Sequence, residues 1–206
     1  MHPVVMAKFQ ELIARYSPPG PDVLELGAVP ATAEGFLEGL AGSNYTGVNM
    51  MLEHEGLGYS IVKANANSLS FSDESFDAVI CNAMFEHDGH FWKSIAEARR
   101  VLRPGGIAYF GTPGFAERVG PAVRFATRVE AKLVHGSSNE SLRRLGRSTT
   151  LGRMVSAATL PFHGAPSDYY RFSPAAHRDI LLEGFEVLEV TTAHRPVRVI
   201  SAGRKL

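Results

Sequence analysis

The chain has 206 residues, of which 45% are hydrophobic and 20% charged, a composition that excludes a disordered or collagen-like chain and suits a globular domain. Its 21 basic residues balance 21 acidic ones, which excludes a general attraction to nucleic acid or to an anionic membrane surface. The one cysteine, Cys81, cannot form an internal disulfide, no apolar run approaches the roughly 18 residues of a membrane span, and the start of the chain is too polar for a signal peptide. We therefore expect a cytoplasmic protein.

Short apolar runs alternate with stretches of helical spacing over the first 112 residues. Residues 1–17 place apolar side chains three or four positions apart, and Pro18, Pro19, Gly20 and Pro21 then end a helix. The runs predicted as strands are 22–26, 45–48, 59–62, 76–81 and 107–110, and the helices predicted between them are 33–40 and 91–102. This alternation predicts a largely parallel sheet with helices on both faces.

The pattern changes after residue 112 and resumes near residue 174. Residues 113–173 contain no clear strand and include a helical fragment over 121–133, whereas 174–182 predicts a helix, and 185–190 with 197–202 predicts an antiparallel strand pair. The fold class that we predict is a Rossmann-like, doubly wound α/β domain: a mostly parallel seven-stranded sheet with a C-terminal antiparallel strand pair and a helical insertion. The prediction is one domain over 1–206, with a core at about 20–112 and 174–206 and an acceptor-side insertion at about 113–173.

Three motifs give this core a family resemblance. Residues 23–27 (VLELG) form an apolar strand that runs into an acidic residue and a turn, residues 69–87 include the block LSFSDESFDAVIC followed by FEH, and residues 96–106 read AEARRVLRPGG. The set resembles the class I S-adenosylmethionine-dependent methyltransferases, of the small-molecule type with a type 11-like domain. The resemblance implies an enzyme of class EC 2.1.1.- that uses S-adenosyl-L-methionine as its cofactor.

The resemblance also implies which residues bind that cofactor. In an open parallel sheet a ligand lies beyond the carboxyl ends of the strands. By resemblance, Glu25 lies near the amino-acid end of the cofactor, Gly27 and Ala28 follow its backbone, Asn49 faces the ribose, Asn65 and Ala66 meet the adenine, and Asn82 passes under the methionine portion.

Four positions depart from the family pattern. Val29 and Ala31 stand where the turn usually has glycines, and Asn49 and Asn65 stand where acidic residues are usual. An asparagine replaces a charge-assisted hydrogen bond with an ordinary one, which weakens each contact by about 1 kcal/mol. The departures keep an alternative open: a degenerate methyltransferase fold that acts without catalysis as a binding or partner protein.

Methyl transfer to a hydroxyl requires a general base, and histidine suits that role. The candidates are His87, which follows an apolar strand, and His163, which precedes the run Asp168-Tyr169-Tyr170-Arg171. For His87 the alternative is a structural loop residue. Tyr170 and Arg171 are candidates for acceptor binding; the alternative is that the tyrosines pack and that Arg171 pairs with the nearby aspartate. No metal site is expected.

The predicted insertion is locally basic, with eight basic residues against three acidic ones between Glu117 and Arg153. Arginine binds phosphate and carboxylate groups bidentately, so an anionic small-molecule acceptor, or a sugar-containing one that carries such a group, fits this segment. The alternative is a solvated helix face. Nucleic acid is disfavoured because Phe125 is the one aromatic residue available for base stacking there. From the family resemblance we expect O-methylation of a small molecule or sugar-containing metabolite.

Overall fold

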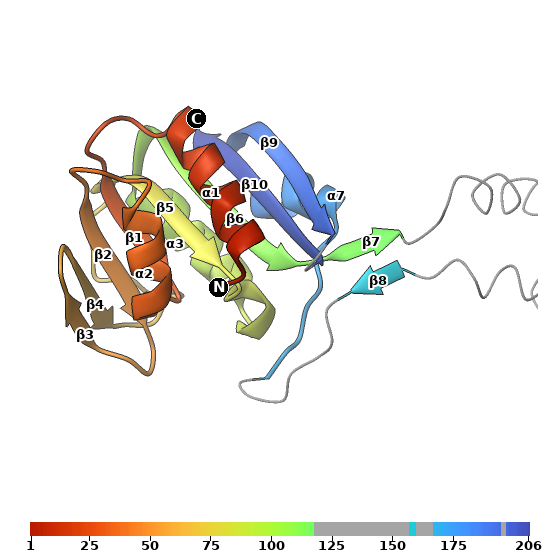
Figure 1. Ribbon diagram of the computed structural model, residues 1–206, viewed down its shortest axis with the longest axis horizontal. Helices are drawn as coiled ribbons and strands as arrows, with labels where there is room; N and C mark the ends of the chain where they lie inside the picture. The colour runs from red at the N-terminus through yellow and green to blue at the C-terminus, as the bar shows by residue number, and fades with distance from the viewer. Residues whose placement is uncertain (118–156, 160–166, 195–196) are drawn as a thin grey trace, which may run out of the picture. The chain divides into compact units, whose positions relative to one another are not determined.

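The computed structural model describes residues 1–117, 157–159, 167–194 and 197–206 (Figure 1). Two compact units are present, one formed by Met1–Gly114 with Leu160–Leu206 and the other by Phe115–Thr159. His163 and the predicted helical fragment 121–133 lie outside the described residues, as does nearly all of the basic segment.

The first unit contains one eight-stranded sheet. Its strands are β1 (Asp22–Leu26), β2 (Asn44–Asn49), β3 (His54–Gly56), β4 (Tyr59–Lys63), β5 (Phe76–Asn82), β6 (Leu102–Pro113), β9 (Phe185–His194) and β10 (Val197–Lys205). Their order across the sheet is β3-β4-β2-β1-β5-β6-β10-β9. The strands from β4 to β6 are parallel, and β10 is antiparallel to both β6 and β9. The predicted fold class is confirmed, with β3 as an additional antiparallel edge strand.

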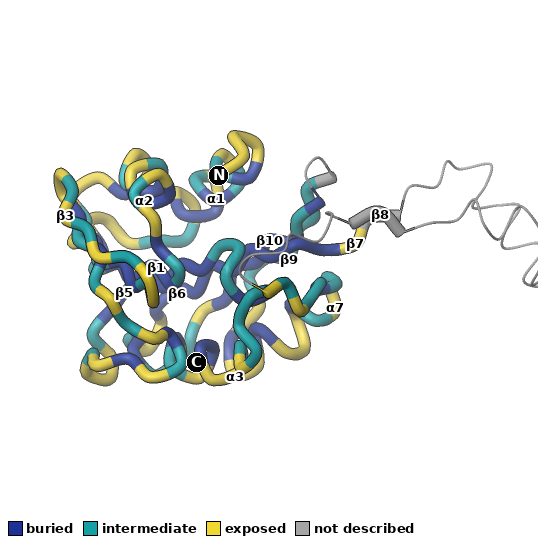
Figure 2. Tube along the Cα trace, turned by 90° about the horizontal axis from the view of Figure 1, so that it is seen from below, coloured by how far each residue is buried: buried dark blue, intermediate teal, exposed yellow. Residues whose placement is uncertain are grey.

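Helices cover both faces of the sheet. The helical segments of this unit are α1 (Pro3–Tyr16), α2 (Pro30–Leu37), the 3₁₀ turn η1 (Phe85–His87), α3 (Phe91–Val101), α7 (Pro174–Ala176) and the π-helical turn η2 (His177–Leu181). Figure 2 shows α1 and α2 on one side of the buried strands and α3 with α7 on the other. Two apolar cores follow from this layering, because each face of the central strands is covered by its own helices.

Helix boundaries follow from residues that the sequence displays. In α1, the buried side chains Val5, Phe9, Leu12 and Ile13 form one stripe toward the sheet. Helix α2 begins at Pro30, three residues earlier than predicted, since proline has no N–H to lose in the first helical turn and the Thr32 hydroxyl caps the free N–H of Val29 at 3.2 Å.

The second unit corrects one prediction. Residues 113–173 were expected to lack strands, but β7 (Phe115–Glu117) pairs antiparallel with β8 (Ala157–Thr159). Three-residue strands carry too little alternation to be recognised in a sequence. The hydrogen bonds of β7 and β8 come from pairing between segments at least 40 residues apart, which the local sequence pattern does not indicate.

A buried histidine joins three elements of the first unit. His177 at the start of η2 is fully buried; its Nε2 lies 2.8 Å from the Thr112 hydroxyl on β6 and its Nδ1 lies 2.8 Å from the Ser201 hydroxyl on β10. Hydroxyl groups serve as donors or acceptors, so both bonds suit a neutral imidazole. Burial lowers the pKa of His177 to about 3, and the ring is therefore neutral in the folded protein at neutral pH.

This histidine gives a prediction about acid stability. The pKa of His177 is lower in the folded chain than in the unfolded chain, so the unfolded chain binds the proton first as the pH falls below 6.5. We expect His177 to reduce the free energy of unfolding by about 1.4 kcal/mol per pH unit from pH 6.5 downward. Urea unfolding of the wild type and of His177→Gln between pH 7 and pH 4.5 measures this slope. Equal slopes for the two proteins would contradict the prediction.

Candidate functional site

The carboxyl ends of β1 and β5 adjoin a cavity of about 290 Å³. The chain leaves β1 toward β2 on one side and returns to β5 on the other, so this is where the strand order reverses. The described residues that line the cavity are Met1, His2, Val5, Gly27, Val29, Thr32, Asn82, Ala83 and Arg198. Two predicted cofactor-binding residues, Gly27 and Asn82, therefore meet in one cavity.

The turn after β1 is narrow and held by the backbone of β2. Gly27 has φ of +77°, and its N–H donates to the Val48 carbonyl at 2.9 Å, as does that of Ala28 at 3.0 Å. Val29 lines the cavity and is 39% exposed, so it forms part of the wall without filling the space. A Cβ on Gly27 would lie 2.8 Å from the Met84 side chain, which shows how closely that side chain approaches the turn.

Glu25 lies directly below this turn. The carboxyl group is 1% exposed; its Oε2 accepts a hydrogen bond from the Tyr45 hydroxyl at 2.7 Å, while its Oε1 has no hydrogen-bond partner among the described residues. Burial raises the pKa of Glu25 to about 7, against the opposing effect of the Tyr45 and Thr32 hydroxyls. Glu25 thus offers one unsatisfied oxygen to a donor group.

Asn82 ends β5 at the cavity, and Ala83 follows it. The Asn82 Oδ1 atom is buried without a hydrogen-bond partner among the described residues, and its Nδ2 lies 2.9 Å from the sulfur of Met1. Ala83 has φ of +57°, a conformation that a residue with a Cβ rarely adopts. Backbone strain and an unpaired polar atom at one strand end are typical of a ligand-binding site.

The residues predicted to meet the ribose and adenine lie outside the cavity lining. The Asn49 amide donates to the Ala28 carbonyl at 2.8 Å and accepts from the Met51 N–H at 2.9 Å, so both of its polar ends bind the protein backbone. Asn65 is exposed, and its Oδ1 accepts from the Asn67 N–H at 2.9 Å, next to buried Ala66. Their contacts with a nucleoside stay a prediction.

His87 lies in a chain of polar contacts that starts on β10. Its Nδ1 is 2.8 Å from the Ser167 carbonyl oxygen, which only accepts, so Nδ1 carries the proton and Nε2 has the basic lone pair. That Nε2 lies 3.9 Å from Oε1 of Glu86, a fully buried residue, and the same Oε1 lies 3.3 Å from Nη1 of Arg198. The contact with the Ser167 carbonyl holds the ring in one tautomer.

The predicted acceptor-binding pair has structural partners. Arg171 forms an ion pair with Asp168 in which the two side chains are 4% and 2% exposed, and it donates to the Tyr170 carbonyl at 2.8 Å. The Tyr170 ring packs edge-on against Phe91, with centroids 5.1 Å apart. These contacts match the structural alternative for both residues, and their role in acceptor binding stays a prediction.

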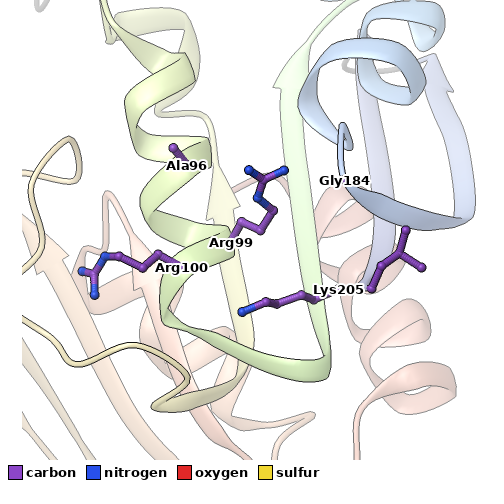
Figure 3. Close-up of a pocket in the computed structure, with 6 residues that line it drawn as sticks. Ala96, Arg99, Arg100, Gly184 and Lys205 are labelled. Carbon is purple, nitrogen blue, oxygen red and sulfur yellow. The ribbon is translucent and has the colours of Figure 1, made fainter.

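A larger depression of about 370 Å³ lies between α3 and the end of β10 (Figure 3), lined by Ala96, Arg99, Arg100, Gly184, Lys205 and Leu206. Its cations are engaged: Arg100 binds Glu97 and Asp73 at 2.8 and 2.7 Å, and Lys205 donates to the Leu102 carbonyl at 2.6 Å. Because it lies away from the carboxyl ends of the parallel strands, we place the candidate site at the smaller cavity.

Comparison with known proteins bears on the fold of the chain. Residues 34–110 match the family model described as a methyltransferase domain. A solved structure of Burkholderia thailandensis 1,6-didemethyltoxoflavin-N1-methyltransferase, with bound 1,6-didemethyltoxoflavin and S-adenosylhomocysteine, aligns with a TM-score of 0.65 at 16% identity, over 98% of this chain and 78% of that one. The core has the class I methyltransferase fold.

The curated relatives of this methyltransferase fold share a short segment with it. An uncharacterized methyltransferase from Mycolicibacterium vanbaalenii is 36% identical over 77 residues, which is 33% of this chain and 30% of the relative. A phthiotriol/phenolphthiotriol dimycocerosates methyltransferase from Mycobacterium ulcerans is 37% identical over 68 residues, 32% of this chain and 25% of the relative. The matched segment thus spans less than a third of either relative.

The family match begins at residue 34, after the turn that departs from the family pattern. Glu86 and Arg198 were missed as site residues by sequence reasoning. The sequence held a signal for Glu86, which directly precedes His87. It held none for Arg198, which is 112 residues away from Glu86.

In the described part of the chain, no three histidine, cysteine, aspartate or glutamate side chains converge as metal ligands, and no helix has the length and apolar character to cross a membrane.

Proposed function

We propose that the protein binds S-adenosyl-L-methionine at the carboxyl ends of β1 and β5 and transfers its methyl group to an oxygen atom of a small molecule or sugar-containing metabolite. The observation that carries the proposal is the cavity bounded by Gly27 and Asn82 at the point where the strand order of a methyltransferase fold reverses. The bound S-adenosylhomocysteine of the Burkholderia thailandensis enzyme supports the cofactor assignment.

The residues at the cavity fit the amino-acid end of this cofactor. Its ammonium group needs acceptors, and Asn82, which lines the cavity, has a buried Oδ1 that lacks a partner in the described structure. Glu25, which is outside the cavity lining, has a second buried oxygen of this kind, Oε1. Its carboxylate needs a donor, and Arg198 lines the cavity. The volume of about 290 Å³ is at the lower end of ligand pockets, so we assign the cavity to the amino-acid end, with the nucleoside directed toward Asn49 and Asn65.

The bound cofactor supplies an electrophilic methyl group on a sulfonium centre. Transfer to a hydroxyl group leaves one proton to be removed, and we assign that proton to Nε2 of His87. The Ser167 carbonyl fixes the tautomer from the other side of the ring, and Oε1 of Glu86 lies 3.9 Å from Nε2. His163 remains a second candidate base from the sequence, outside the described residues.

Titration with S-adenosylhomocysteine tests the cofactor assignment. We expect heat of binding in calorimetry and a higher melting temperature, because a ligand at 100 times its dissociation constant stabilises the folded state by about 2.7 kcal/mol. Transfer of a radiolabelled methyl group to a panel of hydroxylated carboxylates and glycosides then tests the reaction. Adenosine at the same concentrations is the control for nonspecific nucleoside binding.

The second candidate function is a binding or partner protein without catalysis. Val29 and Ala31 in the turn, together with Asn49 bound to the backbone at Ala28, favour it. No heat and no change in melting temperature with millimolar S-adenosylhomocysteine would reject the enzyme and leave this candidate.

A further inference from the structure

We infer that Arg198, held in place by Glu86, is the residue that binds a carboxylate group in the cavity at the ends of β1 and β5. The inference rests on the proposed function, because it names the chemistry by which that site recognises its ligands. Arg198 is a binding residue in this assignment, and Glu86 is a positioning residue that acts through it.

The strand register places Arg198 at the cavity. On β10, Arg198 pairs with Pro113 at the carboxyl end of β6, and its side chain reaches the same cavity as Gly27 and Asn82. Arg198 is the one lysine or arginine among the described residues that line the cavity. A cationic group in a cavity whose other side chains are mostly apolar or amide selects a negatively charged group.

Glu86 holds that cation without using all of its donors. Glu86 is fully buried, and its Oε1 lies 3.3 Å from Nη1 of Arg198, whose side chain is 16% exposed. A guanidinium has five N–H donors in a planar fork, so the contact with one oxygen leaves donors for a bidentate carboxylate. A buried glutamate without this partner would be costly, which keeps the two side chains together.

The charges of the neighbouring groups permit a second carboxylate. Burial raises the pKa of Glu86, so this carboxyl takes up a proton more readily than a surface glutamate. The raised pKa of Glu86 therefore lowers the cost of placing a ligand carboxylate beside it at Arg198.

The carboxylate that binds Arg198 can come from either of two ligands: the amino-acid end of the cofactor or the acceptor. The variant Arg198→Met separates them with three probes. S-adenosylhomocysteine contains the amino-acid end, 5′-methylthioadenosine has the same nucleoside thioether without it, and benzoate is a carboxylate alone. If the cofactor supplies the group, we expect Arg198→Met to bind S-adenosylhomocysteine at least tenfold more weakly and 5′-methylthioadenosine unchanged.

If the acceptor supplies the group, S-adenosylhomocysteine binding stays unchanged in Arg198→Met, while benzoate binding, measured with and without saturating S-adenosylhomocysteine, is lost. The matched control is Arg204→Met on the same strand, where the side chain is exposed and pairs with Glu186 at 2.8 Å; all three affinities should stay at their wild-type values. Wild-type affinities for both S-adenosylhomocysteine and benzoate in Arg198→Met would overturn the inference. If the wild-type protein binds neither S-adenosylhomocysteine nor 5′-methylthioadenosine, the proposed function is overturned instead. In that case the comparison of benzoate binding between the wild type and Arg198→Met, without nucleoside, still tests the role of Arg198.

Two further variants separate binding from folding, since Arg198→Met leaves Glu86 without its partner. The double variant Glu86→Gln with Arg198→Met removes both charges and should melt near the wild-type temperature while keeping the binding loss. Glu86→Gln alone should lower the affinity for the probe whose binding depends on Arg198 and leave the affinity for 5′-methylthioadenosine unchanged. If Glu86→Gln lowers the melting temperature but leaves the ratios between the probe affinities at their wild-type values, Glu86 has a purely structural role and its assignment is overturned.

Discussion

Replacement of Arg171 by methionine is expected to reduce the free energy of unfolding by about 3–5 kcal/mol. The two carboxylate oxygens of Asp168 both bind the guanidinium, and the side chains are 4% and 2% exposed, so the variant removes this guanidinium from a buried carboxylate. Charge loss at an exposed pair costs about 1 kcal/mol or less. Urea unfolding followed by circular dichroism measures the difference.

The double variant Asp168→Asn with Arg171→Met is the control for this prediction. It removes both charges, and we expect it to recover most of the lost stability, because burial of a neutral pair carries no charge-desolvation cost. The exposed pair Arg204–Glu186 provides the matched surface comparison through Arg204→Met. Equal small losses at Arg171 and Arg204 would show that the buried pair has no special importance.

Gly27→Ala is expected to destabilise the fold by about 2–4 kcal/mol and to abolish cofactor binding. The positive φ of +77° alone costs an alanine roughly 1–2 kcal/mol. The added Cβ would also lie 2.8 Å from both Cβ and Cγ of Met84, closer than such atoms approach. Movement of Met84 or of the turn changes the cavity wall, so S-adenosylhomocysteine titration should show no binding while chemical unfolding reports the stability loss.

Gly58→Ala separates the two causes. Gly58 has φ of +83° and open space where a Cβ would stand, so this variant carries the backbone cost alone, with about 1–2 kcal/mol of destabilisation and wild-type ligand affinity. The double variant Gly27→Ala with Met84→Ala removes the clash and should recover part of the binding. An affinity at the wild-type level in Gly27→Ala would mean that the turn lies away from the ligand.

Local pattern was sufficient to predict the central strands and the helix faces. The apolar run 76–81 and the stripe of α1 each specify an element through side chains within a few positions of one another, and the structure has β5 and α1 there. The antiparallel pair at the C-terminus was also predicted, because 185–190 and 197–202 are two strong strand patterns with a short linker. Such elements depend on burial of one face, which is a property of the local sequence.

The polar partners of the site could not be predicted in the same way. Glu86 meets Arg198 across 112 residues, and His177 meets Thr112 across 65, through strand order and register rather than through spacing. The backbone contacts of the Asn49 amide group at Ala28 and Met51 depend on how the β1 turn packs on β2. Polar contacts of this kind are set by the packing of the whole fold.

The position of β10 between β6 and β9 affects how the protein forms during synthesis. β6 and β10 share seven register pairs, Arg198↔Pro113 through Arg204↔Ile107. The side of β6 that faces β10 therefore stays unpaired until residues 198–204 have left the ribosome. An apolar strand edge of that kind is prone to pair with other chains. Nascent chains halted before β10 should therefore recruit chaperones that recognise exposed strands, and they would also lack the Arg198 wall of the ligand cavity.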